Sequence, residues 1–325
     1  MSNQVSSGEL LFVKSVKDGI PNRDPLRDSD ARRIFGEEDG RVSLSDVSVK
    51  RDVRDYALTK YPEGGDSKTN YVFVRREEKE EGGRKLLGRK GIADKTLKDA
   101  GLDKQKDKRT ALMTASFDMR VFGAVFSVGG ENFHDTGPVQ FGWAHSLHPV
   151  ESKYVQGTVV LPSADIKATE AGEETGKTQG TIWSTYMIPF AIFVMPGVIN
   201  PHLAQKTGMA KDDLELLVEG LWKGTLMRQA RGRGLQKPLF LLHVEYKDPL
   251  FRIGYLEEYV SLEPGRDVWL SEQRPTSLKE ITLDVSSLGD LLSKNQDAVD
   301  TARLWLDPEL NLVGREKIAA DVQKI

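Results

Sequence analysis

The sequence predicts an α+β fold in which a core of the order β-α-β-β-α-β is interrupted by polar insertions. Two observations carry this prediction. Segments whose apolar residues alternate or run continuously, as in strands, recur at intervals as far as residue 246. Between them lie two segments whose apolar residues have helical spacing. A chain of 325 residues can also bury a sizeable core.

The first strand and the first helix are predicted near the N-terminus. A strand is expected over residues 9–17, where apolar side chains alternate between the two faces. A loop rich in Pro, Asp and Arg follows, and a helix is expected over residues 45–60. Ser45 is a good N-cap, and Asp46 suits the positive end of the helix dipole. At about 100° per residue the apolar residues of this helix share one arc: Val49, Val53, Tyr56 and Ala57.

The same helix is expected to present a separate cationic face. Lys50, Arg51 and Arg54 share an arc without an acid, and Asp52 and Asp55 fall outside both arcs. Three cations beside a capped helix start suit a phosphate backbone, which needs charge and backbone N–H donors in one place. A solvated helix face with local ion pairs is the alternative for this segment taken alone.

The middle of the chain is predicted to hold two insertions and two core strands. From residue 61 to about 110 the composition turns polar, which indicates an insertion with short helices, one of them over residues 95–100. Core strands are expected over residues 115–128 and 138–143. A strand pair is expected within residues 150–181, on either side of a polar tip at 170–178.

The last core elements follow this second insertion. Residues 183–195 are expected to form a buried strand and residues 239–246 the final one. Between them, Asp212 or Asp213 is expected to cap a second helix whose apolar residues follow the spacing i, i+3, i+4, i+7, i+8. Those apolar residues are Leu214, Leu217, Val218, Leu221 and Trp222. Without the insertions, the order β-α-β-β-α-β is that of ferredoxin-like or RRM-like folds.

Charge is distributed unevenly along the chain. There are 46 Lys and Arg residues against 49 Asp and Glu residues, which excludes a uniformly basic nucleic-acid-binding coat. Residues 84–109 nevertheless hold ten cations against four acids, and residues 223–237 hold five cations and no acid. The sequence from residue 255 onward is acidic, with fourteen acids against eight cations. Basic zones in such a protein favour a localised track for a polyanion.

Composition also limits the compartment and the chemistry. There is no cysteine, which excludes disulfides and thiolate metal sites. The N-terminus lacks a basic-then-apolar signal pattern, and no apolar run approaches about 18 residues. We therefore expect a cytoplasmic protein that does not contact a membrane.

Four segments resemble motifs of one known family. Residues 20–25 resemble its "NPNGDP" loop, although Asn22-Arg23 stands where the family usually has Asn-Gly. The stretch 41–56 resembles its "SLKR" helix, and residues 117–124 resemble its "DxRLFGA" strand. Residues 136–149 resemble its "TGPVQFxW…SLHPV" segment. The motifs occur in family order, so the chain resembles the Cas-seven (Cas7) family of CRISPR type I systems, most closely its I-B branch.

This resemblance implies an architecture shaped like a right hand. A ferredoxin-like palm would comprise residues 1–60, 113–147 and 183–255. Inserted fingers would comprise residues 61–112, and a thumb hairpin residues 148–182. An acidic C-terminal segment, residues 256–325, would pack on the palm.

The resemblance also implies a function and partners. The chain would be a non-catalytic backbone subunit of a Cascade complex that polymerises head to tail along CRISPR RNA. It would present the guide for pairing with target DNA in antiviral defence. Further partners would be subunits of the Cas-five and Cas-eight types, and no cofactor is implied.

The residues expected to contact RNA lie in the loop after the first strand, the first helix, the third core strand and a basic turn. Gly232 and Gly234 in that turn allow close approach of a ligand, and arginines supply bidentate phosphate contacts. A basic turn that only caps the second helix is the alternative. The expected contacts are Asn22, Arg23, Ser45, Lys50, Arg51, Arg54, Gln140, Trp143, Arg228, Arg231 and Arg233.

Two other function classes stay open. Asp24, Asp28 and Asp30 form a tight acidic cluster, and paired carboxylates hold magnesium in enzymes that cut phosphodiesters. A metal-dependent endoribonuclease using Asp24 is therefore one alternative. A general single-strand RNA-binding module that does not assemble is the other. A metal site built from His134, Asp135, His145 and His148 is disfavoured, because the His-x2-His spacing of the last two fits neither an i, i+4 helical pair nor a strand pair on one face.

Overall fold

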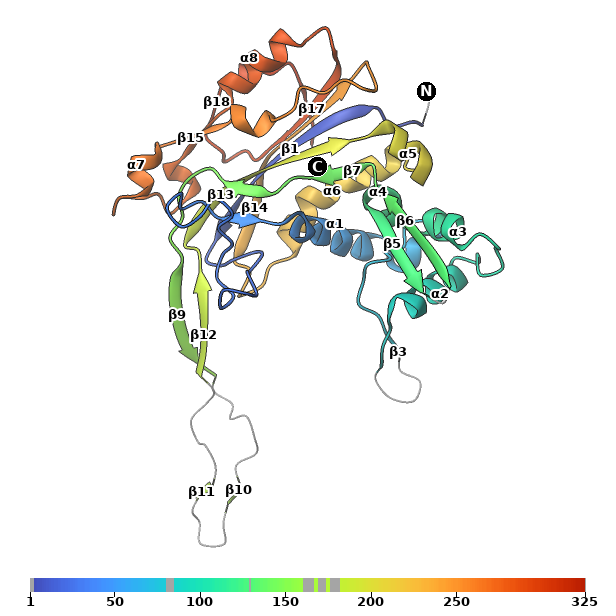
Figure 1. Ribbon diagram of the computed structural model, residues 1–325. Coiled ribbons are helices and arrows are strands. Elements are labelled where there is room, and N and C mark those ends of the chain that lie inside the picture. Colours follow the sequence, from blue (N-terminus) through green and yellow to red (C-terminus); the bar gives the residue numbers. More distant parts are fainter. Residues whose placement is uncertain are drawn as a thin grey trace.

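The computed structural model describes residues 3–79, 85–128, 130–159, 167–168, 174–175 and 182–324. Among these residues the largest sheet has eight strands, with helices on one face and the C-terminal segment on the other (Figure 1). The strands are β1 (Ser7–Lys17), β2 (Ser43–Leu44), β7 (Val139–Phe141), β8 (Ala144–Ser146), β13 (Phe190–Ile199), β14 (Leu235–Tyr246), β17 (Val299–Leu306) and β19 (Asp321–Val322). Their order is β19-β17-β14-β1-β13-β8-β2, and β7 also pairs with β13. The predicted α+β class is confirmed.

Strand β1 lies in the middle of this sheet and is buried on both faces. It pairs antiparallel with β13 and β14, so that Val13 lies opposite Val194 on one side and Phe240 on the other. The strand predicted over residues 9–17 is confirmed and begins two residues earlier. Because successive side chains point to opposite faces, β1 contributes to two separate cores. Leu10, Phe12 and Val16 belong to one core, and Leu11 and Val13 to the other.

Two long helices, α1 (Asp46–Lys60) and α6 (Lys211–Met227), pack against each other on one face of the sheet. They approach closely because α6 carries glycine at the contact. A Cβ atom added to Gly224 would lie 2.3 Å from the carbonyl oxygen of Asp52. The apolar arcs predicted for both helices are confirmed by their burial. The predicted cap is wrong: α6 begins after Ala210, and Asp213 instead accepts a hydrogen bond from the Ala210 N–H at 3.0 Å.

Most of the segment after residue 255 covers the other face of the sheet, as short elements that bury apolar side chains against β1, β13 and β14 in the second core. Its strands β17 and β19 instead join the sheet at the edge beyond β14, so the prediction that residues 239–246 form the final core strand is wrong. His148 is part of this layer, because its ring stacks on Trp269 at 3.4 Å. The elements are η2 (Leu256–Tyr259), β15 (Ser261–Glu263), α7 (Arg266–Trp269), η3 (Leu278–Glu280), β16 (Thr282–Asp284), α8 (Ser286–Lys294), β18 (Leu312–Val313) and η4 (Arg315–Lys317).

The insertion after α1 forms a small helical unit with its own apolar core. The helix predicted over residues 95–100 is α2, which begins earlier, at Arg89. The remaining elements around this unit are η1 (Pro62–Gly64), β3 (Glu78–Lys79), β4 (Lys85–Leu86), α2 (Arg89–Asp99), α3 (Lys108–Ala115), β5 (Gly123–Val128) and β6 (Glu131–Thr136). Helix α5 (Pro201–Thr207) precedes α6. No helix in the described ranges is long and apolar enough to cross a bilayer.

The strand predicted over residues 115–128 is wrong in its first half. Residues 117–122 form helix α4 (Phe117–Phe122), and only residues 123–128 form a strand, β5, which pairs with β6 in a separate two-stranded sheet rather than in the core sheet. All six residues of α4 are buried, so their side-chain pattern does not distinguish a helix from a strand. Gly123, with φ of +80°, ends the helix and begins the strand.

The strand predicted over residues 183–195 is two strands. Residues 182–187 form β12 (Ile182–Met187), which pairs with β9 (Lys153–Thr158) in a hairpin that projects from the sheet (Figure 1). The predicted strand pair therefore exists, but its second strand begins just after residue 181. Only β13 belongs to the core sheet. Within the predicted tip, β11 (Glu174–Thr175) pairs with β10 (Lys167–Ala168), and the rest of 170–178 lies outside the described residues.

Acid should destabilise the protein through His148. Burial lowers the pKa of His148 to about 4, and its Nε2 accepts a hydrogen bond from the Ile192 N–H at 3.1 Å. An unfolded histidine binds a proton below about pH 6.5, so the unfolded state holds more protons between pH 6.5 and 4. Stability therefore falls as the pH falls through this window.

The difference between the two pKa values corresponds to roughly 3 kcal/mol. We expect the gap in unfolding free energy between wild type and H148Q, from urea titrations at pH 7 and pH 4.5, to shrink by about this amount at the lower pH. A gap that stays constant would contradict the assignment of His148 as a buried neutral base.

Candidate nucleic-acid interface

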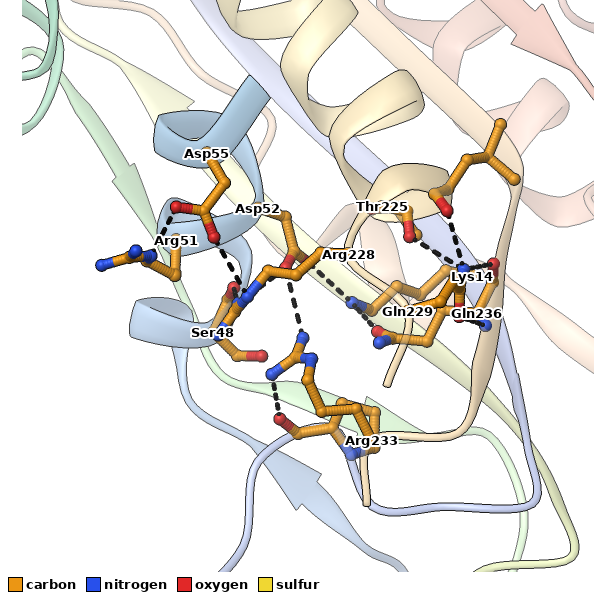
Figure 2. A network of polar contacts seen from close by, with 12 residues as sticks. Lys14, Ser48, Arg51, Asp52, Asp55, Thr225, Arg228, Gln229, Arg233 and Gln236 are labelled. Atoms are coloured by element: carbon orange, nitrogen blue, oxygen red, sulfur yellow. Dashed lines mark hydrogen bonds and ion pairs between the residues drawn. The ribbon is translucent and has the colours of Figure 1, made fainter. Parts of the chain in front are cut away.

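A fully buried carboxylate, that of Asp52 on α1, lies at the centre of a polar cluster on the helical face of the sheet (Figure 2). Its Oδ1 accepts hydrogen bonds from Arg228 Nη1 at 2.8 Å and from Arg233 Nη2 at 3.2 Å. Its Oδ2 lies 3.4 Å from Lys14 Nζ, on strand β1. Burial lowers the pKa of Lys14, and the neighbouring Asp52 partly opposes this effect. The carboxylate therefore joins α1, β1 and the turn after α6.

Further bonds hold the two arginines in place. Arg228 Nη1 also donates to the carbonyl of Ser48 at 3.1 Å, and its Nε lies 3.3 Å from Asp55. Arg233 Nη1 donates to the carbonyl of Pro21 at 2.6 Å. Arg51 pairs with Asp55 at 2.7 Å. We call these residues the Asp52 cluster: Lys14, Arg51, Asp52, Asp55, Arg228 and Arg233.

The loop after β1 is tied to the start of α1. Asn22 Oδ1 accepts hydrogen bonds from the Ser45 N–H at 3.0 Å and from Arg32. The predicted N-cap is confirmed, because Ser45 Oγ accepts from the Val47 N–H. Arg23 donates to the carbonyls of Ser29 and Gly232, both at 2.8 Å. The loop, the helix start and the basic turn therefore form one continuous surface.

The expected acid-free face of Lys50, Arg51 and Arg54 is wrong. Lys50 pairs with Asp46 at 2.8 Å and lies 3.5 Å from Gln140 Oε1. Arg54 Nε lies 2.8 Å from Asp118 Oδ2, and Asp118 is almost fully buried. Arg51 pairs with Asp55, as described above. Each cation therefore has an acidic partner, which comes from one turn away on α1 or from α4.

Lys50 and Arg54 also lie over the ring of Phe122, at 5.4 and 5.2 Å from its centroid. Their side chains are mostly buried. Their contribution to this surface is therefore structural as well as electrostatic.

Two exposed groups at this surface combine a cation with an aromatic ring. The guanidinium of Arg231 lies 3.4 Å from the ring centroid of Trp183, which pairs with Gly157 near the end of the β9–β12 ladder that is farther from the sheet. Arg231 makes no ion pair within the part of the chain that the structure describes. Trp143 is 41% exposed, with the guanidinium of Arg32 6.0 Å from its ring. Near it, Gln140 donates to the carbonyl of Gly137 at 3.0 Å. Arginine beside an aromatic ring suits the bases and phosphates of single-stranded nucleic acid.

The aspartates considered for a metal-dependent nuclease site accept hydrogen bonds from protein groups close to them. Asp24 Oδ1 accepts from the Leu26 N–H at 3.0 Å, and Asp30 accepts from the Ala31 N–H and from Ser152 Oγ. In the described ranges no three His, Asp or Glu side chains gather in a way that fits a metal ion. His145 bonds to Ser43, and His148 is buried on the other face of the sheet.

Sequence reasoning missed three residues of this surface. Lys14 is the clearest case, because it is a charged residue within an apolar strand and shares a face with Phe12 and Val16. Asp52 carries a weaker signal as an acid next to the apolar arc of α1. Trp183 gave none, because its contact with Arg231 joins positions far apart in the sequence.

Comparisons with known proteins agree on one family. A family model described as "CRISPR-associated protein Cas7" matches residues 6–286. A protein of Haloferax volcanii described as "CRISPR-associated protein Cas7" is 29% identical over 346 residues, which cover 98% of this chain and 92% of the relative. A chain of a solved "CRISPR RNA-guided surveillance complex, pre-nicking" has a TM-score of 0.57 at 12% identity, covering 98% of this chain and 96% of its own. This structural likeness supports the fold.

The three cations of α1 should differ sharply in their effect on stability. Arg54→Ala leaves Asp118 buried without its cation, although the carboxylate keeps the N–H groups of Phe73 and Val74. We expect a loss of about 2–3 kcal/mol in unfolding free energy. Arg51→Ala removes an exposed pair and should cost less than about 0.5 kcal/mol. Denaturant titration of the two variants tests this, and equal losses would show that the Arg54 pair is not structural.

Proposed function

Because the chain belongs to the CRISPR-associated Cas7 family, we propose that it is a non-catalytic subunit that binds CRISPR RNA within a surveillance complex. This membership confirms the family inferred from the four sequence motifs. The observation that carries the proposal is the positive charge gathered beside the start of α1. The Asp52 cluster has four cations and two carboxylates, an excess of two positive charges. Arg231 adds a further charge without an acidic partner in the described residues.

The proposed RNA contacts divide by exposure. Arg51, Arg228, Arg231, Arg233 and Trp143 keep accessible surface and are proposed to meet phosphates or bases directly. The other predicted contacts are proposed to shape the surface and add charge, since their side chains are engaged with the protein. These are Asn22, Arg23, Ser45, Lys50, Arg54 and Gln140.

We assign the parts of a hand to this fold as follows. The central sheet with α1 and α6 is the palm, and the helical unit between α1 and α4 is the fingers. The hairpin of β9 and β12 is the thumb, because it extends from the sheet (Figure 1) and its Trp183 contacts Arg231. Apart from β17 and β19, which extend the sheet, the segment 256–325 packs on the palm face that the helices leave uncovered.

Copies of the chain are proposed to assemble head to tail along one long RNA. Such heterologous contacts form an open helical array when the rotation between copies does not close a ring. The protein reads backbone shape and charge, and base pairing with target DNA supplies the sequence specificity. Subunits of the Cas-five and Cas-eight types are the further partners, in the cytoplasm.

The endoribonuclease alternative depends on Asp24. The Asp24 carboxylate accepts a backbone N–H within its own turn, which suits a structural role. Incubating wild type and D24A with complementary RNA in magnesium separates the two functions. Equal, intact RNA in both samples supports a binding subunit, and cleavage by wild type alone supports the nuclease. A general RNA-binding module would instead give isolated monomers on RNA without arrays.

Removing exposed charge from the proposed track should weaken RNA binding. In the double variant R51A/R231A we expect the slope of log K against log salt to fall by about 0.7 for each lost phosphate contact. The matched control K294A/K317A removes the same charge from α8 and η4, on the opposite layer. Its slope should equal that of wild type. Equal slopes for both double variants would exclude a track at this surface.

The hairpin tip should be needed for ordered assembly and not for folding. Residues 168–180 carry three glutamates and one lysine, so their deletion should on charge alone strengthen RNA binding. We expect a thermal melt close to that of wild type, because the deleted segment is polar. We also expect irregular spacing on long RNA, seen by electron microscopy. Arrays as regular as those of wild type would mean that this segment is a passive loop.

A further inference from the structure

The Asp52 cluster has an arrangement that stability alone does not require. A buried carboxylate needs one well-placed cation, and Asp52 has three. Two of them share a single oxygen: Arg228 and Arg233 both donate to Oδ1. Their guanidinium groups are therefore held side by side, and their side chains remain 26% and 18% exposed. The third cation, Lys14, is buried beneath them.

We propose that Asp52 is a positioning residue for RNA binding: its buried carboxylate holds Arg228 and Arg233 as a fixed pair of cations for the phosphate backbone. This inference rests on the proposed function. Asp52 itself is fully buried, so in this proposal it does not contact the RNA. It acts on RNA binding through Arg228 and Arg233, whose guanidinium groups it orients.

Preorganisation is the physical reason for such a residue. A free arginine side chain has many rotamers, and ordering them on binding reduces affinity. Here Arg228 is held by Asp52, by Asp55 and by the carbonyl of Ser48. Arg233 is held by Asp52 and by the carbonyl of Pro21. The pair therefore meets a phosphate without further ordering.

Substituting Lys14 makes it possible to separate the positioning role of Asp52 from its effect on the net charge of the cluster. Lys14 lies 3.4 Å from Asp52 Oδ2 and donates to Gln236 Oε1 at 2.9 Å, whereas both arginines donate to Asp52 Oδ1. Burial lowers the pKa of Lys14, which shows the cost of keeping this charge away from water. Removing Lys14 together with the Asp52 charge restores the original difference between cations and acids. It does not restore the hydrogen bonds from Arg228 and Arg233 to the Asp52 carboxylate.

The test asks whether removing the charge of Asp52 raises or lowers the affinity for RNA. D52N removes a negative charge beside the track, so electrostatics alone predicts tighter binding. Loss of positioning predicts binding that is roughly tenfold weaker, the effect of losing about one charge-assisted hydrogen bond. The matched control is D46N, the same chemical change on the same helix at a half-buried acid that pairs with Lys50. Its affinity should equal or exceed that of wild type.

Affinity is measured by fluorescence anisotropy with a labelled single-stranded RNA oligonucleotide, below the onset of each variant's thermal melt. The double variant K14M/D52N covers the case in which D52N folds poorly. We expect its melt to recover towards that of wild type, while its RNA affinity stays low. Restored stability with wild-type affinity would overturn the inference, because the arginines would then work without Asp52.

The outcomes also separate this inference from the proposed function. If wild type fails to bind the RNA at low salt, the proposed function is wrong and the inference falls with it. If wild type binds and D52N binds as tightly or more tightly, only the positioning role is wrong. If D52N and D46N weaken binding equally, the effect is a general one of α1 and again overturns the inference.

Discussion

The burial of one carboxylate constrains the arrangement of the helical face of the central sheet. Removing a carboxylate from water costs several kcal/mol unless cations and hydrogen bonds surround it. Asp52 meets this need with Lys14 on β1 and the two arginines after α6, which is more cations than one carboxylate requires. The backbone also allows a close approach at this point, because Gly224 has no side chain and α6 can lie against the carbonyl of Asp52. The ion pairs of Asp52 and the close packing at Gly224 therefore both fix the contact between α1 and α6.

The insertion is joined to the core by the same kind of interaction. Asp118 accepts the N–H groups of Phe73 and Val74 and pairs with Arg54 of α1. Two residues later, Arg120 forms a bidentate pair with Asp213 at the start of α6. The small helix α4 carries both residues and so connects the two units through directional bonds. Directional bonds fix orientation more strictly than apolar contact does, which keeps the insertion at one angle to the sheet.

Local sequence patterns predicted the helices and strands whose apolar residues form a regular arc or a continuous run. Helices α1 and α6 and strands β1 and β14 each show a clear apolar arc or run, and each forms where it was expected. The candidate surface was predicted only in outline, because ion pairs between distant segments leave no local signal. Asp118 lies 64 residues from its partner Arg54, and Arg228 lies 176 residues from Asp52. Helix α4 was missed because complete burial removes the periodicity on which prediction depends.

The central place of β1 has a consequence for how the chain reaches this structure during synthesis. Its two neighbours in the sheet, β13 and β14, begin at residues 190 and 235. A ribosome releases the N-terminus first, so β1 emerges long before either partner exists. Its apolar side chains, which serve two cores, stay without their partners until about three quarters of the protein has been made. The sheet is therefore completed late, by closing very long loops, and the nascent N-terminal strand is the segment with most need of chaperone protection.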